Sequence, residues 1–147
     1  MGNVHTFTQH YRQIAGNMSG ELGLESAPAA DCIQTTTFAN MANYDLIVGV
    51  GQVSNCSSGS AVTLQMYQAT DATGGGSTVV TGATDVYTSV ALGSCGALAA
   101  QVRGEDLTAG YQYVGARLTT GQADGDEFAS VQLLEGRARY KQAVLPA

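Results

Sequence analysis

Few side chains in this 147-residue chain could carry catalytic chemistry, and their spacing does not favour it. The two histidines, His5 and His10, would point to different sides of a helix, so they are unsuited to share a metal ion. No Gly-x-Ser-x-Gly elbow or phosphate-binding glycine loop occurs. Because no histidine follows His10, a serine or cysteine nucleophile farther along would have no imidazole base. We therefore expect a protein that is not an enzyme and holds no cofactor.

A cluster of carboxylates, Asp124, Asp126 and Glu127, is the strongest candidate for a cation site. Oxygen-rich turns suit hard cations such as Ca²⁺. Position 128 is Phe and no glycine follows at the required step, so the segment departs from an EF-hand loop. A solvated hairpin tip is the favoured interpretation. A calcium site, or a metal-dependent hydrolase that uses these three residues, is the alternative.

Three of the six basic residues, Arg137, Arg139 and Lys141, alternate along one face of the last expected strand. They could protect a sheet edge from mispairing. Equally, they could form a docking stripe for an acidic partner surface. The chain carries a net charge of −6, which argues against a nucleic-acid partner because little positive charge is available to neutralise phosphates.

The N-terminal segment shows a helical spacing. Phe7, Tyr11, Ile14 and Met18 would fall on one stripe of a helix of about three turns. A lone helix of this length is marginal in water, so we expect it to dock on its own domain or on a neighbour. No secretory leader and no apolar run long enough to span a bilayer are present, so neither export nor a membrane location is expected.

From residue 31 onward the apolar period changes to two, which indicates strands. Val62, Leu64 and Met66 alternate with polar residues, and Leu46, Val48 and Val50 share one face of an earlier strand. The expected strands span residues 32–38, 44–53, 61–69, 78–80, 85–90, 98–102, 112–119, 127–134 and 136–144. Glycine-rich turns separate them, which predicts an all-β fold, an antiparallel β-sandwich or jelly roll. Residues 1–30 would form a helical or extended arm, with residues 20–30 as its connection to the sandwich at 31–147.

A local pattern at residues 107–114 is similar to the tyrosine corner of Greek-key sandwiches. Leu107, Ala109, Gly110 and Tyr113 have the required spacing, although proline is usual where Ala109 stands. The pattern predicts that the Tyr113 ring is buried and that its hydroxyl bonds upstream backbone; Tyr111 is the competing candidate. Such a corner stabilises a fold and carries no function.

The three cysteines, Cys32, Cys56 and Cys95, are widely spaced and form no Cys-x-x-Cys pair. An odd number of such residues is typical of a reducing compartment rather than a disulfide framework. We expect small buried or half-buried thiols. One bridge, either Cys32–Cys56 or Cys56–Cys95, stays open as an alternative.

Four segments together resemble those of small virion proteins of tailed bacteriophages: residues 46–53 (LIVGVGQV), 62–75 (VTLQMYQATDATGG), 107–114 (LTAGYQYV) and 136–141 (GRARYK). The resemblance is to head-decoration, or cement, proteins and does not include residues 7–18. It implies a β-sandwich on the capsid exterior, often trimeric, that binds the major capsid protein and is made in the host cytoplasm. Residues that could contact this partner are Phe7, Tyr11, Ile14, Met18, Arg137, Arg139 and Lys141. The alternative is a tail, fibre or adhesin module that binds a host-surface ligand.

Overall fold

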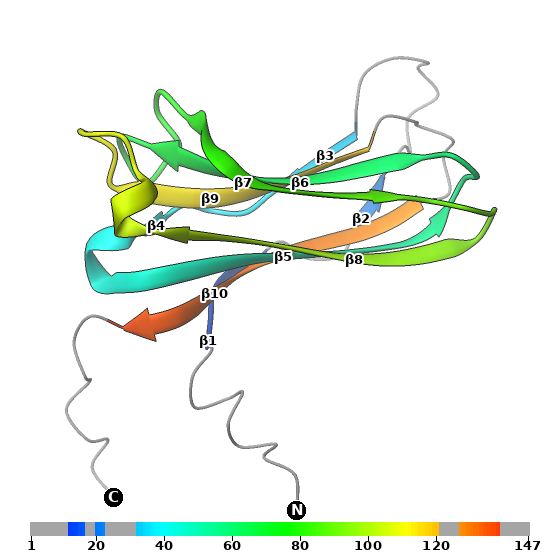
Figure 1. Ribbon diagram of the computed structural model, residues 1–147, viewed down its shortest axis with the longest axis horizontal. Coiled ribbons are helices and arrows are strands. Elements are labelled where there is room, and N and C mark those ends of the chain that lie inside the picture. Colours follow the sequence, from blue (N-terminus) through cyan, green and yellow to red (C-terminus); the bar gives the residue numbers. More distant parts are fainter. Residues whose placement is uncertain (1–11, 17–19, 23–31, 121–126, 139–147) are drawn as a thin grey trace, which may run out of the picture.

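Two antiparallel β-sheets pack face to face in the computed structural model, which describes residues 12–16, 20–22, 32–120 and 127–138 (Figure 1). The first sheet has the order β1-β10-β5-β8, and β2 also pairs with β10; the second has the order β3-β9-β6-β7, and β4 also pairs with β9. The predicted all-β antiparallel sandwich is confirmed.

The strands of the first sheet are β1 (Arg12–Gly16), β2 (Gly20–Leu22), β5 (Tyr44–Cys56), β8 (Ser94–Arg103) and β10 (Glu127–Ala138). Those of the second are β3 (Cys32–Thr35), β4 (Ala39–Asn40), β6 (Ala61–Ala69), β7 (Thr78–Thr88) and β9 (Tyr113–Thr120). Within the described residues, helical structure is limited to two 3-10 turns, η1 (Met41–Asn43) and η2 (Gly104–Asp106).

The core lies between the sheets and is built by alternate residues of each central strand. On β6, Val62, Leu64 and Met66 are fully buried, as the alternation predicts. The opposite strand β5 contributes less side-chain volume. The other large, fully buried side chains include Ile47, Val80, Leu98, Val102, Val114, Leu118, Val131 and Leu133.

Strand β5 turns Ile47 and Val53 toward the core and three other branched apolar residues outward. Leu46, Val48 and Val50 share one face as predicted, but this is the outer face of the first sheet, where they are half-buried. The inner positions between them include Gly49, where a Cβ would stand only 2.5 Å from the Met66 Sδ. A Cβ there would force the Met66 side chain to move, because the opposite sheet already fills the space.

The N-terminal helix prediction is wrong for residues 12–16, which form β1 and pair with β10 through Gln13 and Leu134. Residues 20–22, expected in the connecting arm, form β2 beside the start of β10. Residues 12–16 form a strand despite their helical spacing, because a short isolated helix gains few hydrogen bonds. A strand added to an existing sheet instead pairs along its length with a strand that is already formed.

Several strand boundaries differ from the expectation, and β8 is longer than expected because it begins at Ser94. Residues 78–80 and 85–90 belong mainly to one strand, β7, which passes through an irregularity near Gly82, where φ is +80°. Likewise, β10 continues past Glu135 instead of breaking there. Strand β3 ends at Thr35 because the Thr36 hydroxyl accepts the Ala116 N–H at 2.9 Å, replacing a ladder hydrogen bond.

The two edge strands β7 and β8 run beside each other along the open side of the sandwich (Figure 1). Carboxylates cap donors of β8 on this side: Asp85 Oδ2 accepts the Ala99 N–H at 3.0 Å, and Asp106 Oδ2 accepts the Arg103 N–H at 2.7 Å. An edge whose donors are capped by acidic groups is protected against the addition of another strand.

The tyrosine-corner prediction is wrong for Tyr113. Its ring is half-buried on the outer face of the second sheet, while the neighbouring Val114 fills the core. The loop before β9 is fastened instead by the buried Gln68. Its amide donates to the Thr108 hydroxyl at 2.9 Å and to the Thr78 hydroxyl at 3.2 Å, and its carbonyl accepts the Thr108 N–H at 2.8 Å.

Candidate protein-binding surface

The predicted partner-contacting residues are only partly placed. Ile14 lies on β1, and Arg137 lies on β10 opposite Leu46 of β5. Strand β10 has β5 on one side and β1 with β2 on the other, but the pairing with β1 reaches only Glu135, so the edge-strand interpretation of Arg137 stays a prediction. The docking-stripe interpretation stays a prediction. The residues outside the described part of the chain are Phe7, Tyr11, Met18, Arg139 and Lys141.

The most exposed large apolar side chains of the described residues lie at one end of the sandwich, in the connection between the two edge strands. Val90 is 87% exposed and Leu92 is 80% exposed. We call residues 89–94 the β7–β8 tip. In Figure 1 it is the turn at the right-hand end of the sandwich, where the chain passes from β7 of the second sheet to β8 of the first. Isolated exposed apolar residues are common, but two on one projecting loop form a surface that other proteins can contact.

Hydrogen bonds within the tip hold its shape. The Ser89 hydroxyl donates to the Ala91 carbonyl at 2.9 Å, and the Ser94 hydroxyl donates to the same carbonyl at 2.6 Å. The Ala91 N–H in turn donates to the Ser94 oxygen at 3.2 Å. The backbone of Ala91, between Val90 and Leu92, is therefore held by the side chains of Ser89 and Ser94.

Backbone hydrogen bonds also join the tip to the connection between β5 and β6. The Ser89 N–H donates to the Ser60 carbonyl at 2.8 Å, and the Gly59 N–H donates to the Ser89 carbonyl at 3.0 Å. On the other side, the Gly93 N–H donates to the Cys56 carbonyl at 3.0 Å. Because the tip is tied to both sheets, Val90 and Leu92 project from a fixed base.

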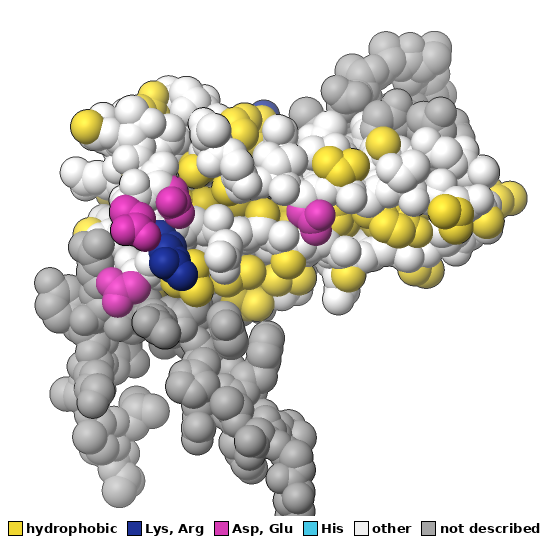
Figure 2. Space-filling model, viewed as in Figure 1, with side chains coloured by type: hydrophobic (Ala, Val, Ile, Leu, Met, Phe, Trp, Pro, Cys, Tyr) yellow, Lys and Arg dark blue, Asp and Glu magenta, His cyan; other side chains and the backbone are white. Residues whose placement is uncertain are grey.

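The tip and the connection beside it carry no ionisable side chain apart from the Cys56 thiol, since their sequences are SVALGS at 89–94 and NCSSGS at 55–60. Figure 2 shows acidic side chains gathered at the opposite end of the sandwich, near η2, where Arg103 pairs with Glu105 at 3.6 Å. An uncharged apolar projection can be buried against another protein without the cost of desolvating a charge.

Sequence reasoning missed this surface because Val90 looked like the end of an expected strand. The available signal was the pattern Ser-Val-Ala-Leu-Gly-Ser, in which small polar residues flank two large apolar ones at a turn. Local sequence could not show that the two side chains point away from the sandwich.

The outer face of the second sheet carries a second, polar cluster. The Arg117 guanidinium lies 4.1 Å from the centroid of the Tyr67 ring, and its Nη1 donates to the Tyr67 hydroxyl at 3.2 Å. That hydroxyl donates to Gln65 Oε1 at 3.4 Å. Nε of Arg117 is buried without a hydrogen-bond partner, and no carboxylate of the described residues lies within ion-pair distance of this side chain. The cluster is a half-buried cation beside an aromatic ring.

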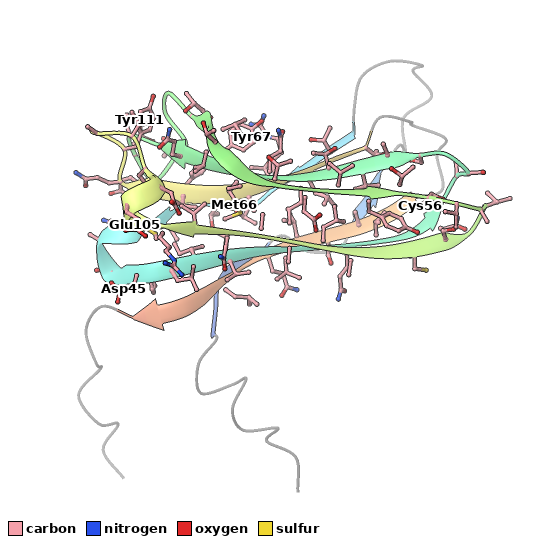
Figure 3. All side chains as sticks on the ribbon, in the orientation of Figure 1. Asp45, Cys56, Met66, Tyr67, Glu105 and Tyr111 are labelled. Atoms are coloured by element: carbon pink, nitrogen blue, oxygen red, sulfur yellow. The ribbon has the colours of Figure 1, made fainter. Side chains whose placement is uncertain are left out.

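Next to this cluster, the connection between β6 and β7 is organised around Asp71, whose Oδ1 accepts from the Thr73 hydroxyl at 2.6 Å and from the Gly75 N–H at 2.9 Å. These hydrogen bonds, that from the Thr73 hydroxyl first, lower the pKa of Asp71 below its ordinary value. A Cβ at Gly74 would meet the Phe38 ring at 2.7 Å, so the ring packs directly on the loop. Figure 3 shows Tyr67 on the same side of the molecule.

The described residues contain no candidate metal site. No group of three or more His, Cys, Asp or Glu side chains there is arranged to hold a metal ion. Asp124 and Asp126 lie outside the described part, and the side chain of Glu127 does as well. Cys56 is buried, and Cys95 is an exposed free thiol, so the Cys56–Cys95 bridge is not formed; the side chain of Cys32 lies outside the described part of the chain, so the Cys32–Cys56 alternative is not tested. Neither 3-10 turn of the described chain is long enough to cross a membrane.

Comparisons with known proteins return likenesses of fold. No family model matches the chain, and no curated protein matches it. One similar structure is TmCBM61 in complex with β-1,4-galactotriose, with a TM-score of 0.36 and 9% identity; the match covers 80% of this chain and 66% of that one. A second is the empty particle of cowpea mosaic virus, with a TM-score of 0.40 and 8% identity; the match covers 93% of this chain and 90% of that one. A third is infectious bursal disease virus, with a TM-score of 0.40 and 15% identity; the match covers 85% of this chain and 31% of that one. All three TM-scores are below 0.5 and all three identities are 15% or less, so the argument about function rests on the surfaces of this chain.

Proposed function

We propose that this chain is a structural protein of a tailed-bacteriophage particle, without catalytic activity, that attaches to the outside of the capsid by binding the major capsid protein. The observation that carries the proposal is the β7–β8 tip, which projects Val90 and Leu92 from a hydrogen-bonded base. A projection that is already ordered loses little conformational entropy on binding, so more of the burial energy appears as affinity.

Binding of this kind would stabilise the capsid by mass action. A protein that binds only the assembled shell favours assembly by RT ln(1 + [L]/Kd), or about 2.7 kcal/mol per site at a hundredfold excess over Kd. A shell offers many equivalent sites, so modest affinity at each site is enough. The resemblance of residues 46–53, 62–75, 107–114 and 136–141 to head-decoration proteins supports the same role.

The test is a binding assay on capsids that lack this chain. Purified wild-type protein and the double variant Val90→Thr/Leu92→Gln are added, and the bound copies per particle are counted by quantitative mass spectrometry. Burying a Val or Leu side chain contributes about 1.5–3 kcal/mol, so the double variant should bind at least a hundredfold more weakly.

The matched control is Val86→Thr. Val86 is 56% exposed, and it lies on the outer face of the second sheet, outside the tip and four residues before Val90. This control should bind like the wild type. Equal binding by the tip variant and the wild type would refute the proposed attachment. In addition, several hundred copies per particle are expected from a shell component, whereas a handful would indicate a tail or portal part.

The second candidate function, recognition of a host-surface ligand from the tail or a fibre, is favoured by one observation. Arg117 is a half-buried cation that stacks on Tyr67 with no carboxylate partner among the described residues. An acidic group of a ligand could complete its hydrogen bonding. Immunogold labelling decides between the candidates: label over the whole head supports decoration, and label confined to the tail or one vertex supports host recognition.

A further inference from the structure

The outer face of the first sheet is apolar along its central strand. Leu46, Val48 and Val50 of β5 all point outward and are half-buried. Leu134 stands opposite Val48 and Ala99 stands opposite Val50, whereas Leu46, at the end of the row, stands between Arg103 and Arg137. No strand of the described chain packs over this face, because the second sheet lies on the other side of the first. Branched apolar side chains on an exposed face of a central strand point to a contact with another protein.

The face also carries no charge over most of its length. On residues 46–54, 95–101 and 130–134, the outward positions hold only apolar, serine, glutamine and cysteine side chains. Two copies of a chain with net charge −6 repel each other, so copies can associate closely only through a neutral surface. A strongly charged partner would instead be drawn to the acidic end near η2. The charge pattern therefore favours a second copy of this chain as the occupant.

The relief of the face is complementary to itself. The row of apolar side chains Leu46, Val48 and Val50, here called the ridge, occupies one end. At the other end lies a hollow of about 550 Å³, whose lining includes Gln52, Cys95 and Ser130. A two-fold axis that lies in the face and crosses the strands would set each ridge over the hollow of the other copy. In such a contact both copies contribute the same surface patch, as in closed two-fold dimers.

We propose that the outer face of the first sheet binds a second copy of this chain about this two-fold axis. With strands about 4.8 Å apart and a rise of about 3.3 Å per residue, three strands over residues 46–54 present roughly 14 Å by 30 Å. The contact would bury on the order of 800–1,000 Å² in total, at the low end for specific interfaces. The dimer should therefore dissociate in the micromolar range rather than be obligate. This inference concerns self-association and does not rest on the proposed attachment to capsids.

The first test is sedimentation equilibrium of the full chain from about 1 µM to 1 mM. The wild type should change from monomer to dimer across this range. Val48→Glu should raise the dissociation constant at least tenfold, because the new carboxylate would be buried against a neutral partner. The matched control Val86→Glu, on the outer face of the second sheet, should leave it unchanged. Circular dichroism checks that each variant is folded.

The second test is a cross-link, which does not depend on a destabilising charge. The two-fold arrangement brings the end of β8 near residue 101 close to the partner's Cys95, whereas it separates the two Cys95 residues by six residues along the strand, or about 20 Å. A bismaleimide with a spacer of about 8 Å should join Gln101→Cys chains into covalent dimers. The wild type should give none, and Cys95→Ser in the Gln101→Cys chain should remove them.

Several outcomes would overturn the proposal. These are a chain that stays monomeric up to 1 mM, a dimer that Val48→Glu leaves intact, and a cross-link between wild-type Cys95 thiols. A trimer, as the phage resemblance implies, would also overturn the two-fold contact. If the chain is a monomer, the face must be covered by another protein or by the first residues of the same chain.

Discussion

Replacing Gly49 with alanine should destabilise the protein by about 1–2 kcal/mol in the wild-type background. A Cβ at this position would lie 2.5 Å from the Met66 Sδ and 3.1 Å from the Ala116 Cβ, so buried atoms must move. Overpacking of a core costs about 1–3 kcal/mol, and the reduced freedom of the unfolded chain returns about 0.4–1 kcal/mol. For a chain of this size the melting temperature should fall by about 2–8 °C.

The decisive measurement is a double-mutant cycle with Met66→Ala. That substitution alone leaves a cavity and should cost about 2–5 kcal/mol. When Gly49→Ala is added to it, the new methyl group enters the space that the Met66 side chain has vacated. The second substitution should then be neutral or stabilising, and the coupling energy should be about 1–2 kcal/mol. Urea denaturation followed by circular dichroism gives the free energies of unfolding.

Gly51→Ala is the matched control for this cycle. A Cβ at Gly51 would stand 2.7 Å from the Leu118 Cδ1 and 3.7 Å from the Leu64 Cδ1, so truncation of Met66 does not make room for it. Gly51→Ala should therefore be destabilising in both backgrounds. If Gly49→Ala costs the same with and without Met66, the account of why β5 turns its branched residues outward is wrong.

Three further predictions test the hydrogen bonds and thiols. The pKa of Asp71, followed by carboxyl NMR, should lie below the ordinary value of about 3.9, and Thr73→Val should raise it. Because the folded-state pKa is lowered, the contribution of Asp71 to stability is present above about pH 4. This contribution is lost as the pH falls through the folded-state pKa. Gln68→Leu should lower the free energy of unfolding by about 1–3 kcal/mol in urea denaturation, because buried groups at both ends of its amide lose their partners. In native protein, iodoacetamide should modify Cys95 rapidly while Cys56 reacts only on unfolding, as peptide mapping by mass spectrometry can show.

Much of the second sheet could be predicted from local pattern. The alternation of Val62, Leu64 and Met66 with polar residues places each on its observed face, and the glycine-rich segment at 71–76 is the observed connection. Period-two patterning works where one face is apolar and the other polar, because a single register then satisfies both. From the low charge and the lack of a recognised catalytic motif the sequence also predicts a binding role, and this stays a prediction.

Alternation tells which residues of a strand share a face, but it does not tell which face meets the core. On β5 the choice depends on the volume that Met66 and Leu118 present from the other sheet, so glycines turn inward and Leu46 and its neighbours turn outward. The same holds for residues 12–16, whose helical spacing gives way to pairing with β10. The projection of Val90 and Leu92 likewise depends on hydrogen bonds between loops about 30 residues apart. These features arise from contacts between distant segments, and short-range sequence patterns carry no information about such contacts.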